Sequence, residues 1–133
     1  MAVTRRAVLF LLPLLALAAE KQKKLKPGIA EVVEISVRRS AEERVIAIEG
    51  RVRNSGQKAI KGLTLVFSIV APGGEEVSRQ HGSIEDDLLE PGDESEFHWQ
   101  MPDHARGVQV RVAASNHDGF EVAVEKPGPY VIE

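Results

Sequence analysis

The sequence predicts an all-β domain, folded as a small antiparallel β-sandwich. Apolar and polar residues alternate over most of the chain after residue 30, and this is the period of half-buried strands. Turn-forming runs such as Asn54-Ser55-Gly56 and Pro91-Gly92 divide the pattern at regular intervals. No window shows the apolar stripe of a helix, and 133 residues make one domain of ordinary size.

Residues 1–18 have the layout of a signal peptide, which we expect to form a helix that precedes the domain. A basic start at Arg5-Arg6 leads into an apolar stretch over 7–17, and the small residues Ala16 and Ala18 favour cleavage after Ala18. The stretch is about half the roughly 20 residues of a membrane-spanning helix, so no stable membrane anchor is expected after cleavage. General secretion and twin-arginine export both remain open.

The chain contains no cysteine, which excludes a lipoprotein anchor, structural disulfides and cysteine metal sites. Together with the signal peptide, this predicts a bacterial envelope protein that is periplasmic or secreted. Residues 19–29 are expected to form a basic linker, whose lysines are Lys21, Lys23, Lys24 and Lys26. A weak attraction of these lysines to anionic lipid is the alternative.

The predicted β-sandwich covers residues 30–126 and begins with two strands. Their expected inward residues are Val33, Ile35 and Val37 in the first strand and Ile46, Ile48, Gly50 and Val52 in the second. A glycine inside a strand indicates a bulge or a close approach of another backbone, so Gly50 marks one of these. The second strand ends at a turn that begins with Asn54.

The next strand is expected to be central because both of its faces are apolar. Leu63, Leu65, Phe67 and Ile69 point inward, and Val66 and Val70 add apolar bulk to the other face. A Pro-Gly-Gly turn within 71–74 leads to residues 75–81, which read as an edge strand with Val77 as its one firm core residue. An acidic crossover follows, held on the core by Ile84, Leu88 and Leu89.

The remaining strands complete an immunoglobulin-like antiparallel β-sandwich of seven to eight strands, with a small open barrel as the alternative. Their expected inward residues are Phe97, Trp99, Met101, Val108, Val110, Val112, Phe120, Val122 and Val124. The C-terminal tail, residues 127–133, contains two prolines and cannot be a central strand. Tyr130 and Val131 are expected to pair along an exposed edge of their own domain or of a partner.

The middle of the chain resembles two families of bacterial extracytoplasmic immunoglobulin-like domains. The matching runs are Gly50-Arg51-Val52-Arg53-Asn54-Ser55-Gly56, Leu63-Thr64-Leu65-Val66-Phe67 after Ile60, Gly73-Gly74-Glu75-Glu76-Val77, and Leu89-Glu90-Pro91-Gly92-Asp93 before Phe97. They look like the FxLYD domain and, almost as well, the CARDB adhesion-type domain. The resemblance implies an extracytoplasmic module for binding or spacing, without a catalytic residue.

Few residues suggest chemistry. His81, His98, His104 and His117 lack the close pairing of a metal site, and no serine lies in a nucleophile motif, so we expect neither an enzyme nor a cofactor. Asp86, Asp87, Asp93 and Glu94 are the candidate cation ligands, because calcium binds clustered carboxylate oxygens. The candidate interaction residues are Val77 and Arg79 in the edge strand and Tyr130 and Val131 in the tail.

The charge excludes one class of partner. The chain has a net charge of −3, and loss of Arg5 and Arg6 leaves 15 basic against 20 acidic residues, or −5. Nucleic acid is therefore not an expected partner, because binding it requires clustered Lys and Arg. We expect a non-catalytic envelope module that binds a protein or a cell-wall component, with a calcium-binding or ligand-binding carrier as the alternative. The sequence does not predict an oligomeric state.

Overall fold

The computed structural model describes residues 25–133, so the predicted signal peptide and most of the basic linker lie outside the described residues. This part of the chain forms ten strands and no helix, which confirms the all-β class. The strands are β1 (Ile29–Ser40), β2 (Val45–Asn54), β3 (Ile60–Lys61), β4 (Thr64–Val70), β5 (Glu76–Ser83), β6 (Leu88–Leu89), β7 (Glu94–Pro102), β8 (Gln109–Ser115), β9 (Glu121–Glu125) and β10 (Tyr130–Val131). A search of the same residues for an apolar helix of membrane-spanning length finds none.

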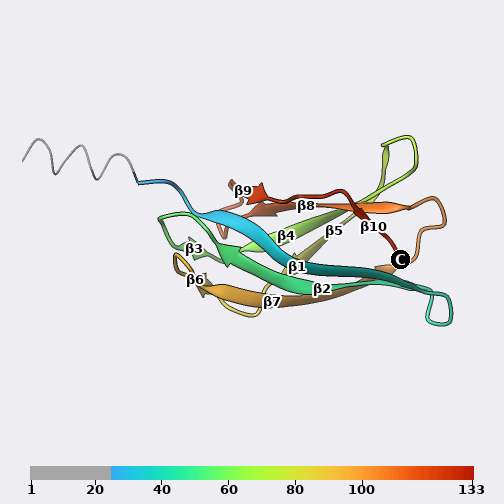
Figure 1. The fold of residues 1–133 in the computed structure, drawn as a ribbon, viewed down its shortest axis with the longest axis horizontal. Helices are drawn as coiled ribbons and strands as arrows, with labels where there is room; N and C mark the ends of the chain where they lie inside the picture. The colour runs from blue at the N-terminus through green and yellow to red at the C-terminus, as the bar shows by residue number, and fades with distance from the viewer. Residues whose placement is uncertain (1–24) are drawn as a thin grey trace, which may run out of the picture.

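Most of the strands belong to one mostly antiparallel sheet. Its strands follow the order β5-β4-β8-β9-β1-β2-β7, β10 pairs with β8, and β3 and β6 form a separate ribbon. The pairing of β1 with β9 is parallel, and the other pairings are antiparallel. Figure 1 shows β1, β2 and β7 on one side of the molecule and β4, β5 and β8 on the other. The structure thus confirms a mostly antiparallel sheet of seven to eight strands.

The sheet curls until its two ends, β5 and β7, approach each other, so the molecule is nearly barrel-like. The contact is made by Trp99 of β7 and Gly82 of β5: a Cβ atom on Gly82 would lie 3.0 Å from Cδ2 of Trp99. Because Gly82 has no side chain, the indole covers the junction between the two strands. Trp99 is half-buried against the core, where the sequence places it.

The core lies between the two sides of the curled sheet. The rings of Phe67 in β4 and Phe97 in β7 meet there with centroids 5.9 Å apart, in a tilted arrangement. The predicted central strand is confirmed, since β4 lies between β5 and β8. The predicted inward residues that are buried are Val37, Ile46, Ile48, Val52, Leu63, Leu65, Phe67, Ile69, Phe97, Met101, Val110, Val112 and Val122.

A bulge corrects the expected phase of the first strand. The register of β1 on β2 shifts between Val32 and Glu34, so Val33 is an extra residue. Ala30 and Val32 are buried in its place, whereas Val33 is half-buried. Gly50 pairs with Ile35, two residues after Val33, and a Cβ atom on Gly50 would stand 2.0 Å from the carbonyl oxygen of Glu34. The expected close packing at Gly50 is confirmed, and the bulge lies in β1, the strand that pairs with β2.

Three other expected core residues, Leu88, Val108 and Phe120, are exposed. Val108 and Phe120 lie one residue before β8 and β9 begin, and Leu88 alternates with the buried Leu89, because successive side chains of a strand point to opposite faces. Val77 is half-buried and packs against the core. It is skipped by the β4–β5 pairing, which passes from Ile69–Ser78 to Val70–Glu76.

The molecule has two distinct ends. At the first end, which we call the N-terminal end, the chain enters at residue 25 beside β3, β6 and the turn between β8 and β9. The opposite end carries the β1–β2 turn, the β4–β5 hairpin, the loop of residues 103–107 and the C-terminus (Figure 1). The candidate sites divide between these two ends and the β5 edge.

Candidate interaction surfaces

The free edge of β5 carries two of the predicted interaction residues. β5 is the last strand of the sheet order and pairs only with β4. Nε of Arg79 lies 2.9 Å from Oε1 of Glu76, and this pair is exposed. The hydrogen bonds of Arg79 and Ser68 lower the pKa of Glu76, the Ser68 bond having the larger effect. The edge thus combines a half-buried Val77 with a paired, accessible guanidinium.

The C-terminal tail is paired within its own domain. Tyr130 and Val131 pair with Val110 and Gln109 of β8. Beyond them the N–H of Ile132 donates to the carbonyl of Val108 at 3.0 Å, and the N–H of Glu133 donates to the carbonyl of Val37 at 3.0 Å. The tail therefore joins β8 to β1. The sequence predicts pairing with an edge of either its own domain or a partner, and the tail pairs with its own domain.

Burial decides what the tail presents to solvent. Tyr130 and Ile132 pack against the core while Val131 is exposed. The hydroxyl of Tyr130 donates to the carbonyl of Lys126, and burial raises the pKa of this hydroxyl. Tyr130 thus belongs largely to the domain's own packing, and Val131 is the accessible residue of the pair.

An ion-pair network fixes the preceding segment. Nζ of Lys126 lies 3.1 Å from Oε2 of Glu31, and Nε of Arg53 lies 3.3 Å from Oε1 of the same carboxylate. The Lys126 hydrogen bond and the charge of Arg53 lower the pKa of Glu31. Because the pKa of Glu31 is lowered in the folded state, the ion pairs of Glu31 stabilise the protein above the ordinary glutamate pKa. This stabilisation is lost as the pH falls.

The acidic crossover is spread out along the chain. The N–H of Asp86 donates to Oγ of Ser95, the carbonyl of Asp87 accepts from Gly62, and Oδ2 of Asp93 accepts from the N–H of Glu90. Glu94 begins β7. Within residues 25–133, no three His, Asp or Glu side chains form a group that suits a metal ion. The calcium hypothesis stays a prediction, without geometric support.

Asn54 is the most highly connected polar side chain at the N-terminal end, although the sequence indicates only a turn. It is fully buried. Its Nδ2 donates to the carbonyls of Lys58 at 2.8 Å and Leu89 at 2.9 Å, and its Oδ1 accepts from the N–H groups of Gly56 at 3.0 Å and Ile29 at 3.3 Å. One side chain thereby ties the start of β1 to the 55–58 loop and to β6.

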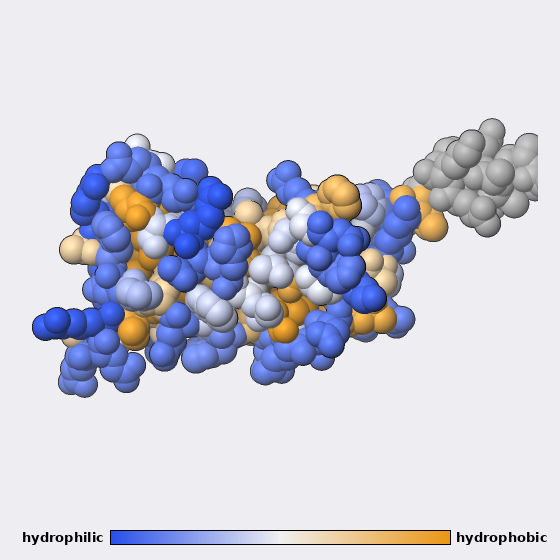
Figure 2. Space-filling view, turned by 180° about the vertical axis from the view of Figure 1, so that it is seen from behind, coloured by the Kyte–Doolittle hydropathy of each residue, from blue (hydrophilic) through white to orange (hydrophobic). Residues whose placement is uncertain are grey.

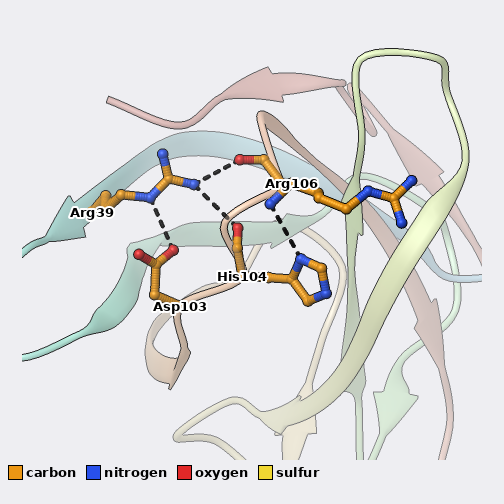
Figure 3. A network of polar contacts seen from close by, with 5 residues as sticks. Arg39, Asp103, His104 and Arg106 are labelled. Atoms are coloured by element: carbon orange, nitrogen blue, oxygen red, sulfur yellow. Dashed lines mark hydrogen bonds and ion pairs between the residues drawn. The ribbon is translucent and has the colours of Figure 1, made fainter.

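Arg39 has a similar role at the opposite end (Figure 3). Its guanidinium donates to Oδ1 of Asp103 at 2.9 Å and to the carbonyl oxygens of Gly107 at 2.6 Å and His104 at 3.5 Å. Arg106, in the same loop, forms an ion pair with Glu75 of the β4–β5 hairpin. The loop of residues 103–107 is thus held between β1 and this hairpin. No local pattern around Arg39 reveals a partner 64 residues away.

Replacing Arg39 by Met is expected to loosen this loop and to destabilise the protein by about 1–2 kcal/mol, because two carbonyls and one carboxylate lose their donor. Amide hydrogen exchange should accelerate at Gly107 and Val108 and stay unchanged in the middle of β2. Arg38→Met is the matched control, since the neighbouring Arg38 is exposed and the structure gives it no side-chain hydrogen bond. Equal effects of the two substitutions would contradict the assignment.

Two open crevices lie on the surface. One, of about 460 Å³, lies at the N-terminal end between Pro27, β3 and the turn at 116–118. The other, of about 610 Å³, lies against β1, β2 and β7 and is lined by Glu34, Arg51 and His98 among others. In the second crevice Arg51 and Glu34 neutralise each other at 2.9 Å. Both crevices mix charges of both signs with small residues.

Comparisons with known proteins bear on the fold alone. No protein-family model and no curated protein matches the chain. Among solved structures, IrmA from Escherichia coli is similar with a TM-score of 0.52 and 8% identity, over 80% of this chain and 99% of that one. The putative ApaA protein from Bordetella pertussis has a TM-score of 0.46 and 16% identity, over 73% and 87% of the two chains. β-Glucosidase 3B from Thermotoga neapolitana has a TM-score of 0.40 and 20% identity over 74% of this chain, and the match spans 16% of the glucosidase.

Proposed function

We propose that the chain is an exported bacterial envelope protein whose β-sandwich domain binds another protein or a cell-wall component and catalyses no reaction. The observation that carries the proposal is the edge of β5, a strand of eight residues that pairs with β4 alone and meets β7 through Trp99 at Gly82. The resemblance to FxLYD and CARDB domains supports the same reading. We include an immunoglobulin-like topology in this proposal. The parallel pairing of β1 with β9, which joins the two sides of the sheet, supports this topology.

Export is inferred from residues 1–18 and is tested on the protein recovered from the periplasm or the medium. We propose that processing removes these residues, so the mass of the recovered protein should correspond to a chain that begins at Ala19. A chain that retains Met1 in these fractions would contradict cleavage.

The chemistry of the β5 edge suits an added strand. A peptide that pairs with an unpaired edge gains main-chain hydrogen bonds, and side-chain contacts then select the sequence. Val77 supplies an apolar contact, and Arg79 favours a partner with an acidic side chain beside the edge.

Capture of a partner from envelope extract tests the proposal. The bait is the chain of residues 19–133, compared with its Val77→Lys variant, because a lysine on the edge opposes strand addition. We expect the unmodified bait to retain a partner and the Val77→Lys bait to lose at least 90% of it, roughly a 1.4 kcal/mol effect. Val131→Lys is the control for the added charge, since Val131 is exposed on another strand. Retention by Val77→Lys equal to that of the control would exclude the β5 edge as the binding site.

A further inference from the structure

The two ends of the sheet meet along a seam, which we define as the line where the β5 edge faces the β7 edge. Gly82 of β5 meets Trp99 of β7, and just beyond β5 the N–H of Asp86 donates to Oγ of Ser95 at 3.3 Å. Residue numbers rise on one side of the seam as they fall on the other. β5 and its continuation therefore run antiparallel to β7, in the relative direction of two strands that could pair.

Side chains, and not a strand pairing, close this seam. Within residues 25–133, β5 pairs with β4 alone and β7 pairs with β2 alone. Each of the two strands therefore keeps one edge whose main-chain groups have no sheet partner in this part of the chain. Parting β5 from β7 breaks side-chain contacts without breaking a ladder of main-chain hydrogen bonds, so the seam opens more easily than a paired joint.

The indole that holds the seam closed leaves one polar group without a partner. A Cβ atom on Gly82 would lie 3.0 Å from Cδ2 and 3.1 Å from Cε3 of Trp99, so the ring fits there because glycine has no side chain. Nε1 of Trp99 is buried and has no hydrogen-bond acceptor among residues 25–133. A buried N–H without an acceptor destabilises the closed position, because this N–H binds water in the unfolded chain. Movement of the ring into solvent removes that cost.

The β5 side contributes little apolar area to the closed seam. Ser78 and Gln80 pair with the buried Ile69 and Phe67 of β4, and paired residues of neighbouring strands point to the same face. The core-facing positions before Gly82 are therefore polar, and both side chains are half-buried. The seam has room for an apolar side chain from another strand to improve this packing.

The seam suits an extended polypeptide better than a glycan. A strand that enters between β5 and β7 can pair with main-chain groups on both sides, and one of its carbonyls can accept from Nε1 of Trp99. The charge of Arg79 on the same edge favours an acidic side chain on that strand. Apolar contact alone offers less, since Figure 2 shows one face of the molecule as mainly hydrophilic, with hydrophobic atoms in separate small patches.

We propose that Trp99 is a gate on the β5 edge, with a closed position on Gly82 and an open position away from it. While the gate is closed, β7 limits access to the last part of β5. When the indole swings out, an extended segment of a partner protein pairs along the whole of β5, and Nε1 of Trp99 donates to a carbonyl of that segment. The inference rests on the proposed function for the identity of the site, and it adds the class of partner and the residue that controls access.

Hydrogen exchange of the indole N–H tests the opening without a substitution. Every strand of the described structure lies within 29–131, so the chain of residues 19–133 contains the complete folded unit. Trp99 is the only tryptophan, and its indole N–H therefore gives a single NMR signal. We expect this N–H to exchange through a local opening, at a rate that low concentrations of denaturant leave unchanged. A rate that rises with denaturant as steeply as that of the core amides of β2 would mean opening only by global unfolding, and would overturn the proposal.

A valine at Gly82 is expected to hold the gate open. Gly82→Val places a side chain where the indole lies, so the fluorescence emission should shift to longer wavelength and quenching by acrylamide should increase several-fold. Gly73→Val is the matched control, because a Cβ atom on Gly73 meets no other atom within 4 Å. Equal fluorescence of the two folded variants would contradict the closed position of Trp99. If Gly82→Val does not fold, the indole exchange of the unmodified chain decides.

Capture from envelope extract then tests the control of access. We expect the Gly82→Val bait to retain several-fold more partner than the Gly73→Val bait, because a larger fraction of its molecules presents the whole of β5. Equal retention by these two baits would overturn the gate and leave the β5 edge as the binding site. Equal retention by the Val77→Lys and Val131→Lys baits would instead contradict the proposed function. The two failures are therefore distinguishable, and the indole exchange depends on neither capture.

Discussion

Replacing Asn54 by Ala is expected to lower the free energy of unfolding by roughly 3 kcal/mol, because the substitution leaves several buried polar groups without a partner. The carbonyls of Lys58 and Leu89 lose their donor, and the N–H groups of Ile29 and Gly56 lose their acceptor. The site is buried at 0% exposure, so water cannot replace the amide without a change in packing. Chemical denaturation of the two proteins measures the difference.

Asn116 provides the matched control for Asn54. It too is an asparagine that organises a turn, since its Oδ1 accepts from the N–H groups of Asp118 and Phe120, each at 3.0 Å. It is half-buried, and both of these side-chain hydrogen bonds are local, within four residues along the chain. Asn116→Ala should therefore cost about 1 kcal/mol or less. Similar losses at Asn54 and Asn116 would mean that Asn54 acts only as a turn residue.

Asn54→Asp adds a test of the hydrogen-bond directions. The substitution retains an acceptor for Ile29 and Gly56 but directs a second oxygen at two carbonyl oxygens. The ionised carboxyl is disfavoured there by burial and by this repulsion, so its folded-state pKa is raised. The stability of the variant should therefore be greatest below the ordinary aspartate pKa and fall as the pH rises through the folded-state pKa.

Ending the chain at Lys126 is expected to destabilise the domain by roughly 3–5 kcal/mol, or to prevent its folding. The deletion removes β10 together with the burial of Tyr130 and Ile132 and the hydrogen bonds that join β8 to β1. Among these bonds, the N–H of Arg39 donates to the carbonyl of Glu133 at 2.7 Å. Without the tail, the second half of β1 becomes an open edge. Thermal and chemical unfolding of the truncated chain measure the effect.

A pair of point substitutions keeps this prediction testable if the truncated chain does not fold. Ile132→Ala removes a side chain that packs against the core, whereas Val131→Ala removes one that is exposed. We expect a loss of about 1–2 kcal/mol for the first and less than about 0.5 kcal/mol for the second. Equal small effects would show that the tail lies on the domain without contributing to its stability.

The strands of this fold could be predicted from the sequence because their signal is local. Alternation in β2, β4 and β7 places every second side chain on the core, and the structure buries Ile46, Phe67 and Met101 as expected. The errors occur where local periodicity no longer applies. At Val33 an extra residue changes the phase, Leu88 alternates with the buried Leu89, and Phe120 lies just before β9 begins.

The candidate surfaces could be predicted only in part. Val77 and Arg79 were expected on an edge strand because the run around them has little apolar content, and β5 is indeed an edge. The roles of Asn54 and Arg39 in joining distant segments could not be predicted, because their partners lie up to 35 and up to 68 residues away along the chain. Most of these partners are backbone groups, which are present in every residue, so no sequence pattern indicates such a contact.

The sequence by itself determined the all-β class, the central position of β4 and most of the inward faces, because alternation and turn residues act over a few neighbouring positions. Only the tertiary structure decided that the tail pairs with β8 and β1, that Trp99 meets Gly82 where the sheet nearly closes, and that Leu25, Leu88 and Phe120 gather at one end. These features depend on which distant strands become neighbours. That choice is made by burial of the whole core and by pairing of backbone groups, which are identical in every residue except proline.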